Sequence, residues 1–218
     1  MYLIFDFDGT LVDSFVCVIE KFNVLADEFN FRRVCSEELH FLRDLTSKEL
    51  LHYLKIPMYK IPSVLYKARS YFKDKIDTLA PFDTIPQILH TLYKEGFSLG
   101  ILTSNSEKNV INWLECHSIR QFFNFIAIES NYLGKKRVLK KILKANNINK
   151  QDAFYIGDET RDIEAARSCE VHSVAVTWGF NSEKVLLRCQ PHYVARKPSD
   201  ILKIGLAFRS RLLPDFLQ

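Results

Sequence analysis

Residues 2–14 of this 218-residue chain read YLIFDFDGTLVDS, a short apolar run followed by a cluster of acids. Residues 2–5 have the length and composition of a buried β-strand. Asp6 and Asp8 follow this run at once, and Gly9 permits a tight turn. Because ligands of open parallel sheets bind beyond the carboxyl ends of the strands, the stretch predicts a strand that delivers carboxylates to a site.

Further apolar runs have the same character and lie at 97–102, 123–128, 153–156 and 171–176. Patterns of helical period separate most of them, over 85–95, over 107–116, from near 135 and from near 160. The alternation of strand and helix predicts an α/β fold in which helices cover both faces of a parallel, Rossmann-like sheet.

The segment from residue 14 to residue 80 departs from this alternation, because it contains no strand-like run. Two apolar stripes of helical period occur in it, one from Phe15 to Phe29 and one from Val64 to Leu79. We therefore expect an all-helical cap domain, residues 14–80, inserted after the first strand of a catalytic core, residues 1–13 and 81–218. The insert leaves the sheet beside the acids, which favours a lid over a decorative subdomain.

Composition limits the classes of function. With 47% hydrophobic residues and a net charge of +4, the chain is globular, and this mild charge excess predicts no nucleic-acid partner. Five cysteines without a CxxC pair indicate reduced thiols and a cytoplasmic location. No stretch is apolar enough to predict a membrane span, and the histidines show no zinc-ligand spacing. The oligomeric state stays open.

Several predicted strands end in residues that suit phosphate chemistry. Asp6, Thr103 and Asp158 follow three of the strands, and Asp8 and Asp162 lie a few residues farther on. We expect all five to meet at one edge of the sheet. Carboxylates in one crevice repel each other unless a cation lies between them, and oxygen ligands suit Mg²⁺.

Four segments resemble, in order, the signatures of the haloacid dehalogenase (HAD) superfamily. They are FDFDGTLVDS at 5–14, ILTSN at 101–105, GK at 134–135 and YIGDETRD at 155–162. The helical insert resembles the small cap of the phosphoglycolate phosphatase-like branch. The resemblance implies a Rossmann-like HAD core and a hydrolase that acts on phosphate esters.

The resemblance also implies roles for the residues of the first two motifs. Asp6 resembles the nucleophile that forms an aspartyl-phosphate. Asp8 resembles the acid and base that serves the leaving group and then the attacking water, and its backbone carbonyl is expected on Mg²⁺. Gly9 is expected to shape a loop whose N–H groups face phosphate. Thr103 and Ser104 would bind phosphoryl oxygens by a hydroxyl and a backbone N–H.

The third and fourth motifs supply the remaining groups of the expected site. Lys135 resembles the lysine that balances the charge of Asp6 and the phosphoryl group, and Lys136 remains the alternative in this lysine-rich stretch. Asp158 resembles a ligand of Mg²⁺, together with Asp6 and Asp8. Asp162 lies one helical turn beyond Asp158 and resembles a partner of metal-bound water or of Lys135.

These observations predict a Mg²⁺-dependent phosphatase that hydrolyses a small phosphorylated metabolite, phosphoglycolate-like or a sugar phosphate, through an aspartyl-phosphate. Arg43, on a cap loop, is a candidate for binding an anionic group of the substrate, and an ordinary surface role is equally open. A sugar-phosphate mutase is the main alternative. A phospho-acceptor signalling domain and a catalytically silent binding protein rank lower.

Overall fold

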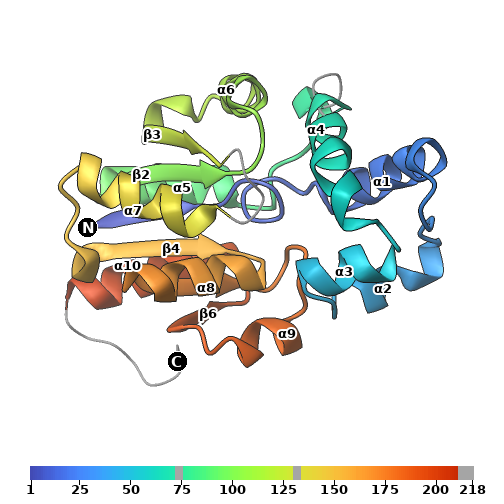
Figure 1. The fold of residues 1–218 in the computed structure, drawn as a ribbon. Helices are drawn as coiled ribbons and strands as arrows, with labels where there is room; N and C mark the ends of the chain where they lie inside the picture. Colours follow the sequence, from blue (N-terminus) through green and yellow to red (C-terminus); the bar gives the residue numbers. More distant parts are fainter. Residues whose placement is uncertain (72–75, 130–133, 211–218) are drawn as a thin grey trace.

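The computed structural model describes residues 1–71, 76–129 and 134–210, and these form a six-stranded parallel sheet with flanking helices and a helical cap (Figure 1). The order across the sheet is β3-β2-β1-β4-β5-β6. The strands are β1 (Tyr2–Phe5), β2 (Ser98–Thr103), β3 (Phe123–Ile128), β4 (Ala153–Gly157), β5 (His172–Val176) and β6 (Tyr193–Ala195). The predicted α/β fold is confirmed, and the short strand β6 is an addition to the five expected strands.

Helices cover both faces of the sheet because side chains alternate along each strand. Leu3 and Phe5 of β1 point into an apolar cluster with helices α5 (Ile85–Lys94), α6 (Glu107–Cys116) and α10 (Pro198–Arg209). Ile4 points the other way, into a cluster with α7 (Lys135–Ala145) and α8 (Thr160–Cys169). Helix α9 (Glu183–Arg188) packs through Leu186 near the sheet edge.

Helix ends follow signals in the sequence. The hydroxyl of Ser106 accepts a hydrogen bond from the Asn109 N–H at 3.2 Å, so Ser106 caps α6. Helix α5 ends at Lys94, and Gly96 then takes a φ of 78°, which glycine adopts without strain. Within the described residues, no helix is both as long and as apolar as a membrane-spanning helix must be.

The order of the strands creates a switch point beside β1. The chain runs outward from β1 to β2 and β3, then returns to pair β4 with the other side of β1. The Asp6 N–H donates to Ile156 O at 2.8 Å across this central pair. Crevices at such switch points bind ligands in α/β sheets, and Asp6 and Asp158 directly follow the two strands.

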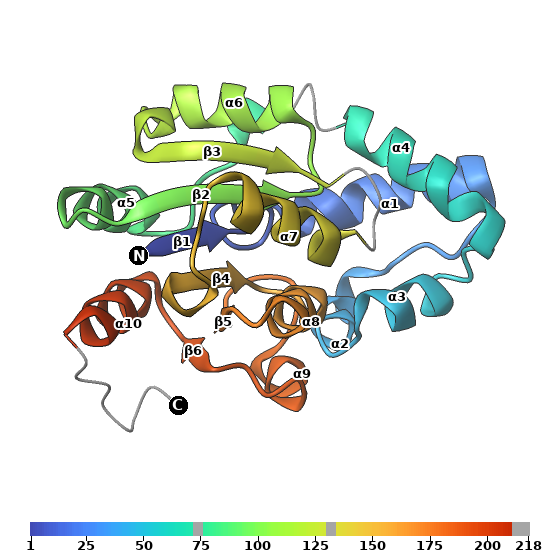
Figure 2. The same cartoon turned by 60° about the vertical axis from the view of Figure 1, so that its left-hand side comes forward.

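The insert forms a helical cap at the carboxyl ends of the strands, as Figures 1 and 2 both show. Its α-helices are α1 (Phe15–Phe29), α2 (Leu39–Leu42), α3 (Ser47–Tyr53) and α4 (Ile61–Tyr71), joined by 3-10 turns at Ser36–Glu38 and Met58–Lys60. Cap residues pack into an apolar cluster of their own, which includes Ile19, Leu42, Leu54 and Val64. The described part of the insert, 14–71 and 76–80, contains no strand of the sheet.

The second predicted stripe, from Val64 to Leu79, is not one helix. Helix α4 ends at Tyr71, and a separate 3-10 turn follows at Ile76–Thr78, while Phe72 lies outside the described residues. Ile76 packs into the core cluster rather than the cap cluster. The end of the insert therefore already contacts the core.

The two connections between cap and core run side by side. Val12 forms an antiparallel bridge with Pro81, and the Asp13 N–H donates to Ala80 O at 3.0 Å. Both crossings thus lie at residues 12–13 and 80–81. This pairing supports the proposed division into a cap of residues 14–80 and a core of residues 1–13 and 81–218.

Candidate active site

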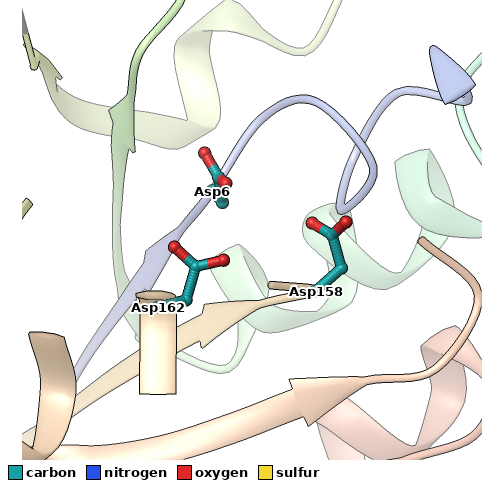
Figure 3. A group of neighbouring side chains, drawn as sticks. All are labelled: Asp6, Asp158 and Asp162. Carbon is teal, nitrogen blue, oxygen red and sulfur yellow. The ribbon is translucent and has the colours of Figure 1, made fainter. Parts of the chain in front are cut away.

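Three buried aspartates meet at the switch point between β1 and β4. Asp6 follows β1, Asp158 follows β4, and Asp162 lies in the first turn of α8. Each offers a carboxylate oxygen within 4.8 Å of the other two. Figure 3 shows the three side chains arriving from separate elements and facing a common space.

Asp6 is held rigidly at the centre of this group. Its Oδ1 accepts a hydrogen bond from the Phe7 N–H at 2.8 Å, and its Oδ2 lies 2.5 Å from the Lys135 ammonium. Burial raises the pKa of Asp6 to about 7, although the charge of Lys135 acts in the opposite direction. A nucleophilic carboxylate must be ionised, so a further cation beside Asp6 would favour its reactive form.

Lys135 links Asp6 to Asp162. It starts α7 after Gly134, and its buried ammonium also lies 2.5 Å from Asp162 Oδ1. Burial lowers the pKa of Lys135, but the carboxylates of Asp162 and Asp6 raise it by more, so the lysine stays charged. Lys136 is exposed, so Lys135 is the lysine that the fold directs into the site.

Asp162 is fixed by further contacts. The Tyr155 hydroxyl donates to Asp162 Oδ1 at 3.1 Å, and the Glu159 N–H donates to Oδ2 at 3.0 Å. Both oxygens therefore already accept hydrogen bonds from the protein, one of them charge-assisted. This arrangement suits the expected supporting role, in which Asp162 positions Lys135.

Asp158 lies in a tight pocket of backbone. Its Oδ1 accepts from the Thr10 hydroxyl at 2.7 Å, and its Oδ2 accepts from the Phe180 N–H at 2.6 Å. Gly9 has a φ of 77°, and a Cβ there would lie 2.2 Å from Asp158 Oδ2. The Gly9 N–H donates to Val12 O at 2.9 Å, so Gly9 contributes the shape of the loop rather than this N–H to phosphate binding.

Asp8 faces the same site from the loop after β1. Its Oδ2 accepts a hydrogen bond from the Asn105 side-chain amide at 2.9 Å. Burial raises the pKa of Asp8, and the Asn105 hydrogen bond partly opposes the shift. Asn105 is itself held by the Asn109 amide, which donates to Asn105 Oδ1 at 3.0 Å. A carboxyl group with a raised pKa is suited to donate and then recover a proton.

Thr103 and Ser104 of the second motif directly precede Asn105, which bonds Asp8. Thr103 ends β2 and is buried, and its hydroxyl oxygen accepts a hydrogen bond from the Asn105 N–H at 3.0 Å. Ser104 is half-buried and lines the cavity described below. The expected phosphate-binding pair is therefore at the edge of the site, within one turn of chain.

The acidic group fits the expected Mg²⁺. Burial raises the pKa of Asp158 well above its usual range, and the negative charges of Asp6, Glu159 and Asp162 raise it further. One lysine ammonium compensates only part of this negative charge. Oxygen donors on Asp6 and Asp158, with the Asp8 carbonyl nearby in the chain, are the kind of ligands that Mg²⁺ prefers.

A cavity of about 140 Å³ lies between the cap and these residues. Its floor includes Asp8, Ser104 and Asn105, and the apolar side chains of its walls come mostly from the cap, among them Phe15, Val18, Phe22, Leu45 and Leu50. A void holds a water once about 10–15 Å³ is open to the centre of the water molecule, so this cavity has room for several groups of that size. The site is therefore shaped for a small molecule.

Arg43 is placed at the contact between cap and core. Its guanidinium donates hydrogen bonds to Trp178 O at 3.0 Å and to Gly179 O, and its own carbonyl accepts from the Ser182 N–H at 2.8 Å. Arg43 is not among the residues that line the cavity. These contacts hold the cap against the loop after β5, and binding of substrate by Arg43 stays a prediction.

The cavity contains charged residues that the sequence analysis did not single out. Lys21 is a cap residue that lines it, and Glu159 and Arg161 line it from the core. Lys21 follows Val18 by three residues and so lies at the edge of an apolar stripe, a position that could have drawn attention to it. Glu159 is half-buried, and it accepts a hydrogen bond from the Ser47 hydroxyl of the cap at 2.6 Å.

Known proteins that are similar to this chain are hydrolases of phosphate compounds, the class of enzyme that the site also suggests. Residues 3–176 match the family model described as haloacid dehalogenase-like hydrolase. The chain is 32% identical to a phosphoglycolate phosphatase of Synechococcus elongatus over 201 residues, which cover 92% of this chain and 95% of that protein. It is 27% identical to the pyrophosphatase PpaX of Listeria monocytogenes over 206 residues, 93% of this chain and 94% of that one.

Solved structures of phosphatases have the same fold as this chain. A predicted phosphatase from Clostridium acetobutylicum superposes with a TM-score of 0.81 at 26% identity, covering 94% of this chain and 97% of that one. The four motifs, the parallel sheet and the family match thus agree, and the predicted membership is confirmed. This chain belongs to the haloacid dehalogenase-like hydrolase family.

Proposed function

We propose that this hydrolase is a Mg²⁺-dependent phosphatase that acts on a small phosphorylated metabolite, phosphoglycolate-like or a sugar phosphate, through an aspartyl-phosphate on Asp6. One observation carries the proposal: Asp6 lies within 4.8 Å of two other buried aspartates and bonds the Lys135 ammonium at 2.5 Å. The names of the two curated relatives, a phosphoglycolate phosphatase and a pyrophosphatase, support it.

The first half of the reaction transfers the phosphoryl group to the enzyme. A carboxylate oxygen of Asp6 attacks phosphorus while the bond from phosphorus to the leaving oxygen breaks. Asp8 gives its proton to that leaving oxygen, a role that its raised pKa suits. Lys135 balances the charge shared by Asp6 and the phosphoryl group.

The second half restores Asp6. Asp8, now ionised, takes a proton from a water molecule as the water oxygen attacks phosphorus, and the bond to the Asp6 oxygen breaks. Inorganic phosphate leaves, and Asp8 is protonated again. The hydrogen bond from Asn105, at 2.9 Å, holds the Asp8 carboxyl in one orientation for both steps.

Thr103 and Ser104 bind the phosphoryl oxygens beside Asp8, as their place at the end of β2 suggests. Asp6, Asp158 and the Asp8 carbonyl would hold Mg²⁺, which neutralises charge on the transferring phosphoryl group when bound. The cap residues around the cavity exclude water and contact the leaving group.

A screen of phosphorylated metabolites tests this function. With Mg²⁺ the protein should release phosphate from a subset of small esters, chelation by EDTA should abolish the release, and added Mg²⁺ should restore it. Asp6→Asn should remove turnover while the fold survives, whereas Asp83→Asn, at an exposed core position, should change nothing. Full activity in EDTA, or in Asp6→Asn, would contradict the proposal.

The mutase alternative makes the same intermediate and differs in its fate. A mutase returns the phosphoryl group to a sugar phosphate instead of to water. Product analysis of a sugar-phosphate reaction by ³¹P NMR separates the two, because a phosphatase yields inorganic phosphate and a mutase yields an isomeric ester.

A further inference from the structure

The loop between β5 and α9, residues 177–182, contacts both the cap and the end of β4. Figures 1 and 2 both show the chain before α9 beside cap helices α2 and α3. On the core side, the Phe180 N–H donates to Asp158 Oδ2 at 2.6 Å. On the cap side, the Ser182 N–H donates to Arg43 O at 2.8 Å. One short loop thus links the cap to an expected ligand of Mg²⁺.

Asn181 lies in this loop, and its side-chain amide joins the cap to the core. The residue is buried, with 4% of its surface exposed. Its Nδ2 donates to Leu45 O of the cap at 2.7 Å, and its Oδ1 accepts from the Thr160 N–H of the core at 3.0 Å. Because a carbonyl only accepts and an N–H only donates, these two partners fix the orientation of the amide.

The core end of this link is the turn that carries Asp158 from β4 into α8. Thr160 is the first residue of α8, so its N–H has no partner within the helix, and Asn181 Oδ1 supplies one. The Asn181 N–H also donates to the carbonyl oxygen of Asp158 at 3.2 Å. Asn181 therefore holds the turn at both of its ends, residues 158 and 160.

The cap end of the link depends on the position of the cap. Leu45 lies between α2 and α3, far along the chain from the two cap connections at residues 12–13 and 80–81. If the cap moved away from the core, Asn181 Nδ2 would lose its acceptor and would have to turn toward water. The amide is planar and rigid, so such a turn would also withdraw Oδ1 from the Thr160 N–H.

We propose that Asn181 is a positioning residue that couples docking of the cap to the position of Asp158, and so to the binding of Mg²⁺. This inference rests on the proposed function, in which Asp158 is a ligand of Mg²⁺. With the cap docked, Asn181 supports the turn at residues 158–160, and with the cap lifted this support is lost. Coupling between two sites is reciprocal, so Mg²⁺ should also favour the docked cap.

A purely structural role for Asn181, as a cap of α8, makes a different prediction. In Asn181→Asp an ionised carboxylate still accepts from the Thr160 N–H, but it cannot donate to Leu45 O. If Asn181 served only α8, this variant would behave as the wild type. Ser182→Ala is the matched control, because it removes the neighbouring hydrogen bond from Ser182 to Asp44 of the cap and leaves the bonds of Asn181 in place.

The first measurement is the affinity for Mg²⁺ without substrate, by isothermal titration calorimetry, with circular dichroism to check that each variant folds. Asn181→Ala should bind Mg²⁺ about tenfold more weakly than the wild type, the scale on which the loss of an orienting contact weakens a metal site. Ser182→Ala should bind it with unchanged affinity. Equal affinities in the wild type and Asn181→Ala would overturn the proposal.

The second measurement is hydrogen exchange of the cap by mass spectrometry, with and without Mg²⁺. In the wild type, Mg²⁺ should slow exchange in peptides that cover residues 42–50, by up to about the same tenfold factor, and should not affect α10. Asn181→Ala and Asn181→Asp should lose this response, and Ser182→Ala should keep it. If Asn181→Ala does not fold, Asn181→Asp decides alone.

Three outcomes of the exchange experiment would overturn the coupling. They are a full response in Asn181→Asp, an equal loss of response in Ser182→Ala, and no response in a wild type that binds Mg²⁺. A wild type that binds no Mg²⁺ at all would instead contradict the proposed function on which the coupling rests.

Discussion

The ammonium group of Lys135 lies 2.5 Å from Asp6 Oδ2, although 129 positions separate the two residues in the chain. Both are buried, and the same ammonium reaches Asp162. One cation thus joins the proposed nucleophile to the fourth motif. This contact depends on the fold, because only the parallel sheet brings the end of β1 beside the start of α7.

Replacing Lys135 by methionine should lower kcat/KM by about 100-fold or more, because the charge that stabilises the phosphoryl group in the transition state is lost. Lys136→Met should leave activity unchanged, since Lys136 is exposed. Steady-state kinetics on the best substrate measure both, with circular dichroism to check that each variant folds. Similar losses in the two variants would mean that the position of the lysine does not matter and would contradict the assignment.

Thr10 should govern the affinity for Mg²⁺ without touching substrate. Its hydroxyl donates to Asp158 Oδ1 at 2.7 Å, and Thr10→Val removes that hydrogen bond with little change of shape. Loss of such an orienting partner typically weakens metal binding about 10–100-fold. We expect a corresponding rise in the Mg²⁺ concentration for half-maximal activity. Thr91→Val, on the exposed side of α5, is the control, and an unchanged Mg²⁺ requirement in Thr10→Val would count against Asp158 as a ligand.

Arg43→Ala tests whether Arg43 holds the cap or binds substrate. Arg43 bonds the carbonyls of Trp178 and Gly179, so its loss should loosen the cap and lower kcat/KM equally for 2-phosphoglycolate and 2-hydroxyethyl phosphate, by about tenfold. Arg33→Ala, an exposed cap position, should have no effect. A loss confined to 2-phosphoglycolate, whose leaving group carries a carboxylate that 2-hydroxyethyl phosphate lacks, would support the prediction that Arg43 binds substrate.

His172 makes stability depend on pH far from the active site. Burial lowers the pKa of His172 below its ordinary value of 6.5, and the neighbouring His192 lowers it further. Below pH 6.5 the unfolded chain therefore binds a proton that the folded protein excludes, so the free energy of unfolding falls as the pH drops through this range. The ring of the half-buried His172 stacks on the ring of Phe154, with the two ring centroids 4.8 Å apart.

His172→Gln should reduce this dependence. The difference in unfolding free energy between about pH 8 and about pH 5, measured by urea titration, should be smaller than in the wild type. His52→Gln, at an exposed cap position, should keep the full difference. An unchanged difference in His172→Gln would show that other groups cause the acid sensitivity.

Strong local patterns in the sequence account for most of the fold. The runs at 2–5 and 123–128 became β1 and β3 with the predicted bounds, because buried parallel strands are continuously apolar. Strand β6 is only three residues long and has too few residues to show a period. The stripe from Val64 to Leu79 has helical spacing throughout, but Ile76 belongs to another packing cluster, which no local pattern reveals.

Some residues of the candidate site could be predicted from the sequence, and others could not. Asp6, Asp8, Asp158 and Lys135 lie in short motifs, so their residue types and spacing indicate them directly. The positions of Lys21 and Arg43 depend on how the cap packs against the core, because Lys21 lines the cavity and Arg43 bonds the loop at Trp178. Such contacts join segments far apart in the chain, and no spacing rule predicts them.

The covalent intermediate is the central claim, and borohydride trapping tests it most directly. The protein is mixed with Mg²⁺ and its best substrate, quenched in acid during turnover, and treated with sodium borohydride, which reduces an aspartyl-phosphate to homoserine. Peptide mass spectrometry should find homoserine at position 6, more of it in Asp8→Ala because hydrolysis of the intermediate is slowed, and none without substrate. Turnover without any modification of Asp6, or homoserine at another aspartate, would contradict this account.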